Sequence, residues 1–242
     1  MSARNFIARH IALLIATFRD GLSLFRYAPL IPLIAIIPEF LQHVAEIKLG
    51  MFASKEAFRA LAMDPVRWSW GYFKIAGLIV SWLAAARYWG AREQGERWWD
   101  LRKLPWRKVL LAIALNVLVT LPLLALDGRV DAKVLQMINI AVSIATLPLI
   151  IYLVGALLGD GAQTLAKVYR SGWWAALRIV VLVAICFVPL QWLHSLDHRL
   201  AFGQPPVLVW LLMTWDALLV GIIAVFIGTA LHHGYRGAGD PG

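Results

Sequence analysis

The chain has 242 residues, of which 61% are hydrophobic and only 15% are charged, and its mean hydropathy is +0.71. A soluble domain of this length carries about a quarter charged residues, so too few polar groups remain here to coat a globule. These values exclude a soluble enzyme, a disordered tail and a fibrous repeat, and they predict a single all-α polytopic membrane domain over residues 1–242.

The charged residues are unequal in sign, because 23 lysines and arginines stand against 14 acidic residues, a formal net charge of +9. In a membrane protein such an excess is typical of loops that face an anionic leaflet. We therefore expect the lipid bilayer, with anionic lipids at the cytoplasmic face, to be the main partner. Nucleic-acid binding is not expected, since acidic residues interrupt the most basic segment and the bilayer tethers it.

Residues 1–20 predict an amphipathic helix that lies in the membrane interface. Apolar side chains recur at helical spacing through this segment, and three arginines surround them. Such a helix buries its apolar face at the boundary between headgroups and acyl chains. We expect it to lead directly into the first membrane span.

Six later segments predict membrane spans, because a spanning helix needs roughly 20 apolar residues. In four of them the apolar run is by itself long enough to predict a span, over 108–127, 134–159, 178–196 and 206–231. Two earlier segments, 25–46 and 72–89, are weaker: the first holds three prolines and Glu39, and the second holds Lys74 and Arg87. We expect both to span. The alternative is a shallow re-entrant pair, which would leave four true spans.

The distribution of basic residues predicts the orientation. With six spans, most lysines and arginines fall on the side that holds the N-terminus, the 87–108 and 160–178 loops and the C-terminus. Because positively charged loops are retained in the cytoplasm, both termini are expected to be cytoplasmic. The short loops favour the inner (plasma) membrane of a bacterium.

The segment GDGAQTLAKVYRSGWWAALR, residues 159–178, places small and basic residues and a Ser-Gly-Trp-Trp sequence before a span. In this it resembles the YciC-like six-span bacterial proteins and the related membrane domain of glycerophosphodiester phosphodiesterases. The amphipathic start and the proline-rich first span are similar too. The resemblance covers the architecture of most of the chain but no diagnostic motif. It implies a helical inner-membrane bundle without a transferable active site, since the soluble phosphodiesterase domain has no room here.

Asp216 is the one charged residue inside the last predicted span, about ten residues from its start and therefore near the membrane midplane. A carboxylate in that position is costly unless it is protonated or paired. One interpretation is a proton-coupled or substrate-binding carboxylate. The other is a structural hydrogen bond to Asn116 or Asn139, of the kind that holds helices together in a bilayer.

A second group of polar residues lies at the predicted outer ends of two spans. Glu39 and His43 are four residues apart on the first span, and the fifth span ends with Gln191, His194, Asp197 and His198. If the two ends pack together, imidazoles and carboxylates converge. The i, i+4 spacing of His194 and His198 suits two metal ligands, but HSLDH lacks the glutamate of an HExxH motif. The sequence therefore favours a solvated or structural rim, and we predict no metal and no cofactor.

The basic segment 92–108 is interrupted by acids and rich in tryptophan, which is typical of contact with lipid headgroups. The residues expected to make that contact, together with a later tryptophan pair, are Trp98, Trp99, Arg102, Lys103, Trp106, Arg107, Lys108, Trp173 and Trp174.

The chain has no Walker-type phosphate loop, no GxGxxG after a strand, no CxxC pair and no GxSxG elbow, so we assign no catalytic residue. The first hypothesis is an inner-membrane protein that acts in transport or in membrane and envelope organisation. One alternative is an intramembrane or interfacial enzyme that uses the outer-face cluster. Another is a structural subunit that packs against a partner membrane protein or a second copy of itself.

Overall fold

The computed structural model describes residues 3–126 and 128–237. The part of the chain described contains helices and no strand, which confirms the all-α class. The helices are α1 Ala3–Tyr27, α2 Leu30–Lys48, α3 Lys55–Ala60, α4 Pro65–Glu93, α5 Trp106–Leu126, α6 Ala132–Leu157, α7 Leu165–Ser171, α8 Trp173–Ala201 and α9 Pro206–Arg236, with the 3-10 turns η1 Met51–Ala53 and η2 Leu101–Lys103.

Five of these helices, α2, α5, α6, α8 and α9, are long and apolar enough to cross a membrane. The chain thus has the make-up of a multi-pass membrane protein. The segment 72–89 forms part of α4, which is 29 residues long but is not among these five helices. It carries Lys74 and Arg87, which lower its hydropathy.

The start predicted for the first span at residue 25 is wrong. Residues 25–27 belong to α1, and α2 begins at Leu30 after Pro29. Proline has no backbone N–H and disturbs a helix least in its first turn, so the two prolines at 29 and 32 lie at the start of α2. Helix α1 correspondingly runs beyond the predicted interfacial segment 1–20 to Tyr27.

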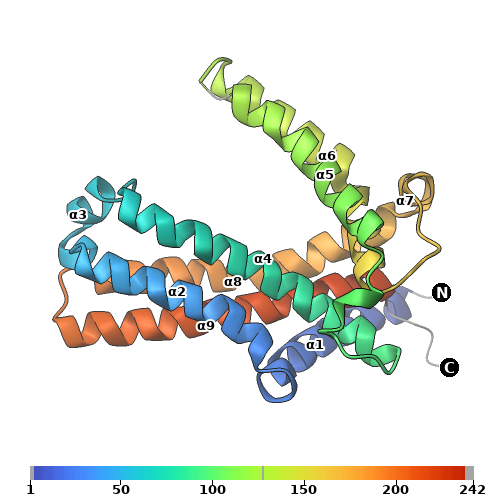
Figure 1. Ribbon diagram of the computed structural model, residues 1–242, viewed down its shortest axis with the longest axis horizontal. Helices are drawn as coiled ribbons and strands as arrows, with labels where there is room; N and C mark the ends of the chain where they lie inside the picture. The colour runs from blue at the N-terminus through green and yellow to red at the C-terminus, as the bar shows by residue number, and fades with distance from the viewer. Residues whose placement is uncertain (1–2, 127, 238–242) are drawn as a thin grey trace. The chain divides into compact units, whose positions relative to one another are not determined.

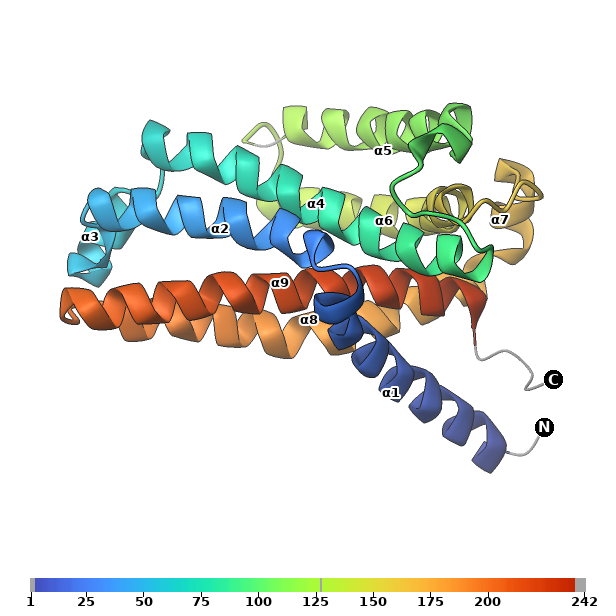
Figure 2. The same ribbon diagram turned by 60° about the horizontal axis from the view of Figure 1, so that its bottom comes forward.

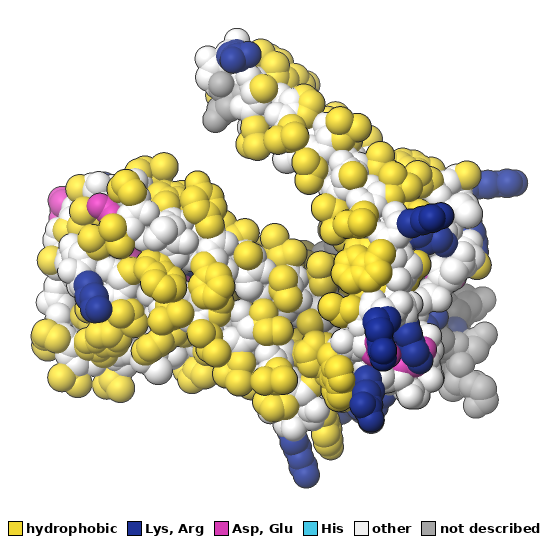
Figure 3. Space-filling model, in the orientation of Figure 1, with side chains coloured by type: hydrophobic (Ala, Val, Ile, Leu, Met, Phe, Trp, Pro, Cys, Tyr) yellow, Lys and Arg dark blue, Asp and Glu magenta, His cyan; other side chains and the backbone are white. Residues whose placement is uncertain are grey.

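The chain divides into two compact units. Unit 1 comprises Met1–Ala85 and Leu182–Ala230, and unit 2 comprises Ala86–Val181 and Leu231–Gly242. Within unit 1, the helices α2, α4, α8 and α9 run side by side (Figures 1 and 2). Hydrophobic side chains cover much of α2 and α4 on the face shown in Figure 3, as expected for helices in contact with acyl chains.

Small residues allow the helices of unit 1 to approach closely. A Cβ at Gly221 of α9 would lie 2.5 Å from the side chain of Ile36 on α2, and Ala224 packs with Ala35 in the same interface. These small residues of α9 therefore pack against α2 within the chain.

Unit 2 is built around the α5–α6 hairpin and is held by polar contacts to backbone carbonyls. Lys108 donates to the carbonyls of Gly161 and Gln163, at 2.7 and 2.9 Å. Arg178 donates to the carbonyl of Gly234 at 2.6 Å. These contacts tie the start of α5 to the 158–164 loop and the start of α8 to the end of α9.

Asp160, in the loop after α6, accepts several hydrogen bonds within unit 2. It accepts hydrogen bonds from the Tyr235 hydroxyl at 2.6 Å, the Gln163 amide at 3.1 Å and the Ala162 N–H at 3.0 Å. Burial by itself would raise the pKa of Asp160, but the hydrogen bonds outweigh it and hold the pKa below its usual value. Such a carboxylate stabilises the folded state fully when the pH is above its pKa in the unfolded chain, about 3.9. This stabilisation is lost as the pH falls through the lower pKa of the folded state.

Asp160→Asn is therefore expected to lower the free energy of unfolding by about 1–2 kcal/mol at neutral pH, and by less below about pH 4. Unfolding in mixed detergent–dodecyl sulfate micelles at the two pH values measures the difference. Asp131→Asn is the matched control, because Asp131 caps α6 and asparagine caps a helix equally well. A loss at Asp160 that is equal at both pH values would contradict the assignment.

Candidate functional site

Three imidazoles converge on one buried carboxylate in unit 1. Asp216 of α9 is 0% exposed. Its Oδ2 lies 2.9 Å from Nε2 of His43 on α2, and its Oδ1 lies 2.7 Å from Nδ1 of His194 on α8. Nε2 of His198, also on α8, lies 3.4 Å from Oδ2. Residues from three helices thus share a single carboxyl group.

His43 also contacts two further carboxylates from its own helix. Its Nε2 lies 3.3 Å from Oε1 of Glu39, and its Nδ1 lies 2.9 Å from Oε2 of Glu46. His43 is therefore held between carboxylates on both sides, and its orientation is fixed.

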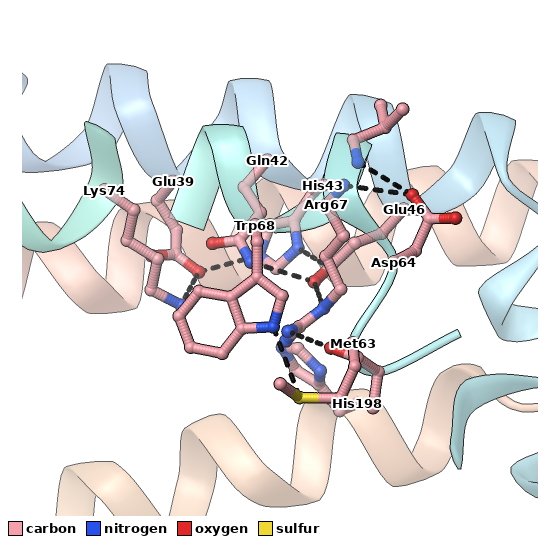
Figure 4. Close-up of polar contacts among 12 residues, drawn as sticks. Glu39, Gln42, His43, Glu46, Met63, Asp64, Arg67, Trp68, Lys74 and His198 are labelled. Atoms are coloured by element: carbon pink, nitrogen blue, oxygen red, sulfur yellow. Dashed lines mark hydrogen bonds and ion pairs between the residues drawn. The ribbon is translucent and has the colours of Figure 1, made fainter. Parts of the chain in front are cut away.

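Helix α4 supplies the cations that balance the outer carboxylates (Figure 4). Lys74 Nζ lies 2.7 Å from Glu39 Oε1, and Arg67 Nε lies 2.9 Å from Glu46 Oε1. The Gln42 amide donates to the same Glu46 oxygen at 3.2 Å. Without counting the imidazoles, three carboxylates (Glu39, Glu46 and Asp216) and two cations (Lys74 and Arg67) leave a formal charge of −1, so a cation is the ligand that the cluster favours.

Helical periodicity explains why these residues share a face. Glu39, His43 and Glu46 follow the i, i+4, i+7 pattern, and His194 and His198 are four apart. Each of the two helices also carries a proline five residues before its first histidine: Pro38 precedes His43, and Pro189 precedes His194. Each proline removes one backbone hydrogen bond next to the cluster.

Aromatic side chains close the cluster at the end near η1. The rings of Phe52 and Phe58 each lie 5.8 Å from that of His198, edge to face. Phe52 is buried with Ala201 and Met213. Water is therefore kept from His198 on this side, which strengthens electrostatic interactions in the cluster.

Within the described part of the chain, two buried polar atoms of the cluster, Glu39 Oε2 and Gln42 Oε1, have no hydrogen-bond partner. Such atoms are rare in folded proteins and indicate a site for a further ligand or a functional role. Two triads could each hold a metal ion, His43–His198–Asp216 and Glu39–His194–Asp216, with one ligand atom per residue and all within 4.8 Å of one another.

The structure brings together residues that the sequence assigned to two separate groups. Glu39, His43, His194 and His198 of the outer-face group lie around Asp216, which was expected at the midplane. Asp197 is buried beside them on α8, with Oδ2 unpartnered, whereas Gln191 is half-buried and makes no side-chain contact that places it in the cluster.

The Asn116 and Asn139 amides find acceptors within their own helices. Both lie in unit 2, and each amide donates to the carbonyl four residues earlier in its own helix, at 2.9 and 3.0 Å. Asp216 instead accepts from imidazoles of its own unit. An asparagine can satisfy its amide within its helix, whereas a buried carboxylate needs donors from other helices.

Sequence reasoning missed Glu46, Gln42, Arg67 and Lys74 as members of the cluster. Glu46 had a signal, since it is three residues after His43 on the same helical face. Lys74 was interpreted as a residue near the end of a weak span, where a long side chain reaches the interface. In the structure its ammonium points to a buried carboxylate instead.

The residues expected at lipid headgroups lie in unit 2. Trp99, Trp106, Trp173 and Trp174 are exposed, Trp174 the most at 79%, and Trp98 is half-buried. Arg102 pairs with Asp100, and Lys103 with Glu96; Arg107 is exposed. Lys and Arg side chains gather where α4 ends and in the loop that follows it (Figure 3).

Comparison with protein-family models, with curated proteins and with solved structures finds no match to this chain. The resemblance to YciC-like proteins therefore stays a prediction.

Proposed function

We propose that this chain is a six-span protein of the bacterial inner membrane, with both termini cytoplasmic, that transports a cation through unit 1. Five long apolar helices support several crossings. Helix α4 would be the sixth span: Lys74 and Arg67 pair with carboxylates of α2, so their charges are compensated within the bundle. The excess of lysine and arginine on one side supports the orientation.

The observation that carries the proposal is the contact of three imidazoles with the fully buried Asp216. An ionisable residue inside a membrane helix is expensive to maintain and is by default a candidate for an ion pathway. Here the surrounding charges leave the site anionic, so a cation is the ligand that it would attract.

The prolines next to the cluster give transport a structural basis. Pro38 and Pro189 interrupt the hydrogen bonding of α2 and α8 close to His43 and His194. Interrupted helices line the substrate sites of many transporters, because such helices can bend around a bound ion. Bending at the two prolines would open the cluster.

The test is ion flux into proteoliposomes that contain the purified chain, with H⁺, K⁺, Mg²⁺ and Zn²⁺ as separate probes. We expect the wild type to carry at least one of these cations, and Asp216→Asn to reduce that flux more than about tenfold, equivalent to about 1.4 kcal/mol. Asp131→Asn, the same substitution at a cap in unit 2, should leave it unchanged. Absence of flux for all four cations, or equal flux in Asp216→Asn, would disprove the proposal.

An interfacial enzyme is the second candidate. His198 is only three residues from the end of α8, so part of the cluster lies close to one helix end rather than at mid-span. Hydrolysis of a membrane-lipid ester that is lost in Asp216→Asn, without flux of any cation, would favour this candidate.

We also propose that the tryptophan-rich segment of unit 2 contacts anionic lipids. Trp99 is 59% exposed and has Arg97 over its ring at 6.0 Å, a pairing of aromatic and cation that suits headgroup depth. Trp99→Ala is expected to weaken co-sedimentation of the detergent-depleted protein with phosphatidylglycerol vesicles relative to phosphatidylcholine vesicles. Equal retention on both would count against the lipid contact.

A further inference from the structure

We propose that the cluster around Asp216 is a binding site for a divalent transition-metal ion of the zinc class, with His43 Nε2, His198 Nε2 and Asp216 Oδ2 as ligands and with Glu39 and His194 beside them. The inference concerns the same site as the proposed transport and names the ion. Binding itself does not require that the ion be transported.

The ligand types select the class of ion. Imidazole nitrogens suit Zn²⁺, Cu²⁺, Ni²⁺ and Fe²⁺, whereas Mg²⁺ and Ca²⁺ prefer sites made of oxygen ligands. The two triads, which share Asp216, together offer three histidines and two carboxylates. The site should therefore reject Mg²⁺ even when Mg²⁺ is in large excess.

The distances already approach those of a metal site. Zinc bonds to nitrogen and oxygen are about 2.0–2.1 Å, so ligand atoms in a tetrahedral site are about 3.3 Å apart. Nε2 of His43 and of His198 lie 2.9 and 3.4 Å from Asp216 Oδ2. The two imidazole nitrogens thus already lie near the spacing of metal ligands from Asp216 Oδ2, and all ligand atoms of this triad lie within 4.8 Å of one another.

The groups behind the ligands form the support that metal-binding histidines usually have. The second nitrogen of His43 lies 2.9 Å from Glu46 Oε2, and Glu46 is fixed in turn by Arg67 and Gln42. A histidine held by a carboxylate in this way presents its other nitrogen to a metal in a fixed orientation. Glu46 is therefore a positioning residue and not a ligand.

A second, independent observation is the state of Glu39. It is 0% exposed, its Oε1 bonds Lys74 and its Oε2 has no partner. A buried carboxylate oxygen left unpaired costs free energy, which a cation beside it would recover. One carboxylate oxygen of Glu39 also belongs to the second triad, with His194 and Asp216, so the same side chain can supply a ligand.

The test uses the full chain in detergent, without a histidine tag and stripped of metal. We expect one Zn²⁺ per chain in competition with a chromophoric chelator, no displacement by Mg²⁺, and a visible Co²⁺ absorption typical of nitrogen and oxygen ligands. Asp216→Asn and His43→Gln should weaken Zn²⁺ binding by more than about 100-fold, since even outer-shell substitutions cost about 10–100-fold.

Two further variants separate the roles. Glu46→Gln should weaken binding by about 10–100-fold while the Co²⁺ absorption keeps its shape, as for a positioning residue. His10→Gln, at a histidine on α1 outside both triads, should bind as the wild type does. Gel filtration identifies any variant that fails to fold, and the wild-type stoichiometry tests the proposal without any variant.

Absence of Zn²⁺ and Co²⁺ binding by the folded wild type, or equal binding by Asp216→Asn and His43→Gln, would overturn the inference and leave a metal-free hydrogen-bond network. The result is distinguishable from failure of transport. Tight Zn²⁺ binding without flux would support the metal site and contradict transport. Flux of H⁺ or K⁺ without Zn²⁺ binding would support transport and contradict the metal site.

Discussion

Glu46→Ala is expected to lower the free energy of unfolding by about 3–5 kcal/mol, because removal of one partner of a buried ion pair leaves the other charge uncompensated. Glu46 is 1% exposed and bonds Arg67, Gln42 and His43 at once. Without its carboxylate, the guanidinium and the imidazole lose their shared buried partner. Unfolding in mixed micelles, followed by tryptophan fluorescence, measures the loss.

Two variants show whether the loss comes from the ion pair. Glu56→Ala removes an exposed glutamate of α3 in the same unit and should change stability by less than about 0.5 kcal/mol. Arg67→Met combined with Glu46→Ala should cost less than the sum of the two single changes, since both partners of one contact are then removed together. A loss below about 1 kcal/mol for Glu46→Ala would show that the cluster is solvated.

The sequence predicts the helices well where a long apolar run is enough to locate them. The 134–159 and 206–231 runs each fall almost wholly within one helix, α6 or α9. The start of the first span was not predictable, because residues 25–30 are mostly apolar on both sides of the helix break at Ala28 and Pro29. A hydropathy profile depends only on the residue types, whereas the break between α1 and α2 depends on the backbone N–H that Pro29 lacks.

The cluster was only half predictable, because periodicity shows which residues share a helix face but not which helix lies opposite. It grouped Glu39 with His43 and His194 with His198, and it left Asp216 alone. The α8–α9 connection did hold a signal. His194 and Asp216 lie about 10 and 15 Å along their helices from a short turn at 202–205, so an antiparallel hairpin brings them to similar depth. The cations of α4 depend on tertiary packing and had no such signal.

Gly77→Ala is the second change with a large expected effect, since it acts where a proline has freed a carbonyl. Pro38 has no N–H to donate, so the Ile34 carbonyl lacks its usual helical partner, and Gly77 of α4 packs against it. A Cβ at residue 77 would lie 2.6 Å from the Ile34 oxygen and 2.9 Å from Pro38 Cγ. Backbone atoms cannot turn aside as a side chain can, so α2 and α4 must separate.

We expect Gly77→Ala to lower the free energy of unfolding by about 1–3 kcal/mol, and Gly77→Val by more. Gly71→Ala on the same helix is the matched control: its Cβ would make only ordinary contacts, the nearest at 3.5 Å, and alanine favours a helix by up to about 1 kcal/mol over glycine. The two alanine substitutions should therefore change the free energy of unfolding in opposite directions.

Because separation of α2 from α4 also draws Glu39 away from Lys74, Gly77→Ala should weaken Zn²⁺ binding as well, while Gly71→Ala should not. Equal effects of the two substitutions would mean that α4 does not pack against the freed carbonyl.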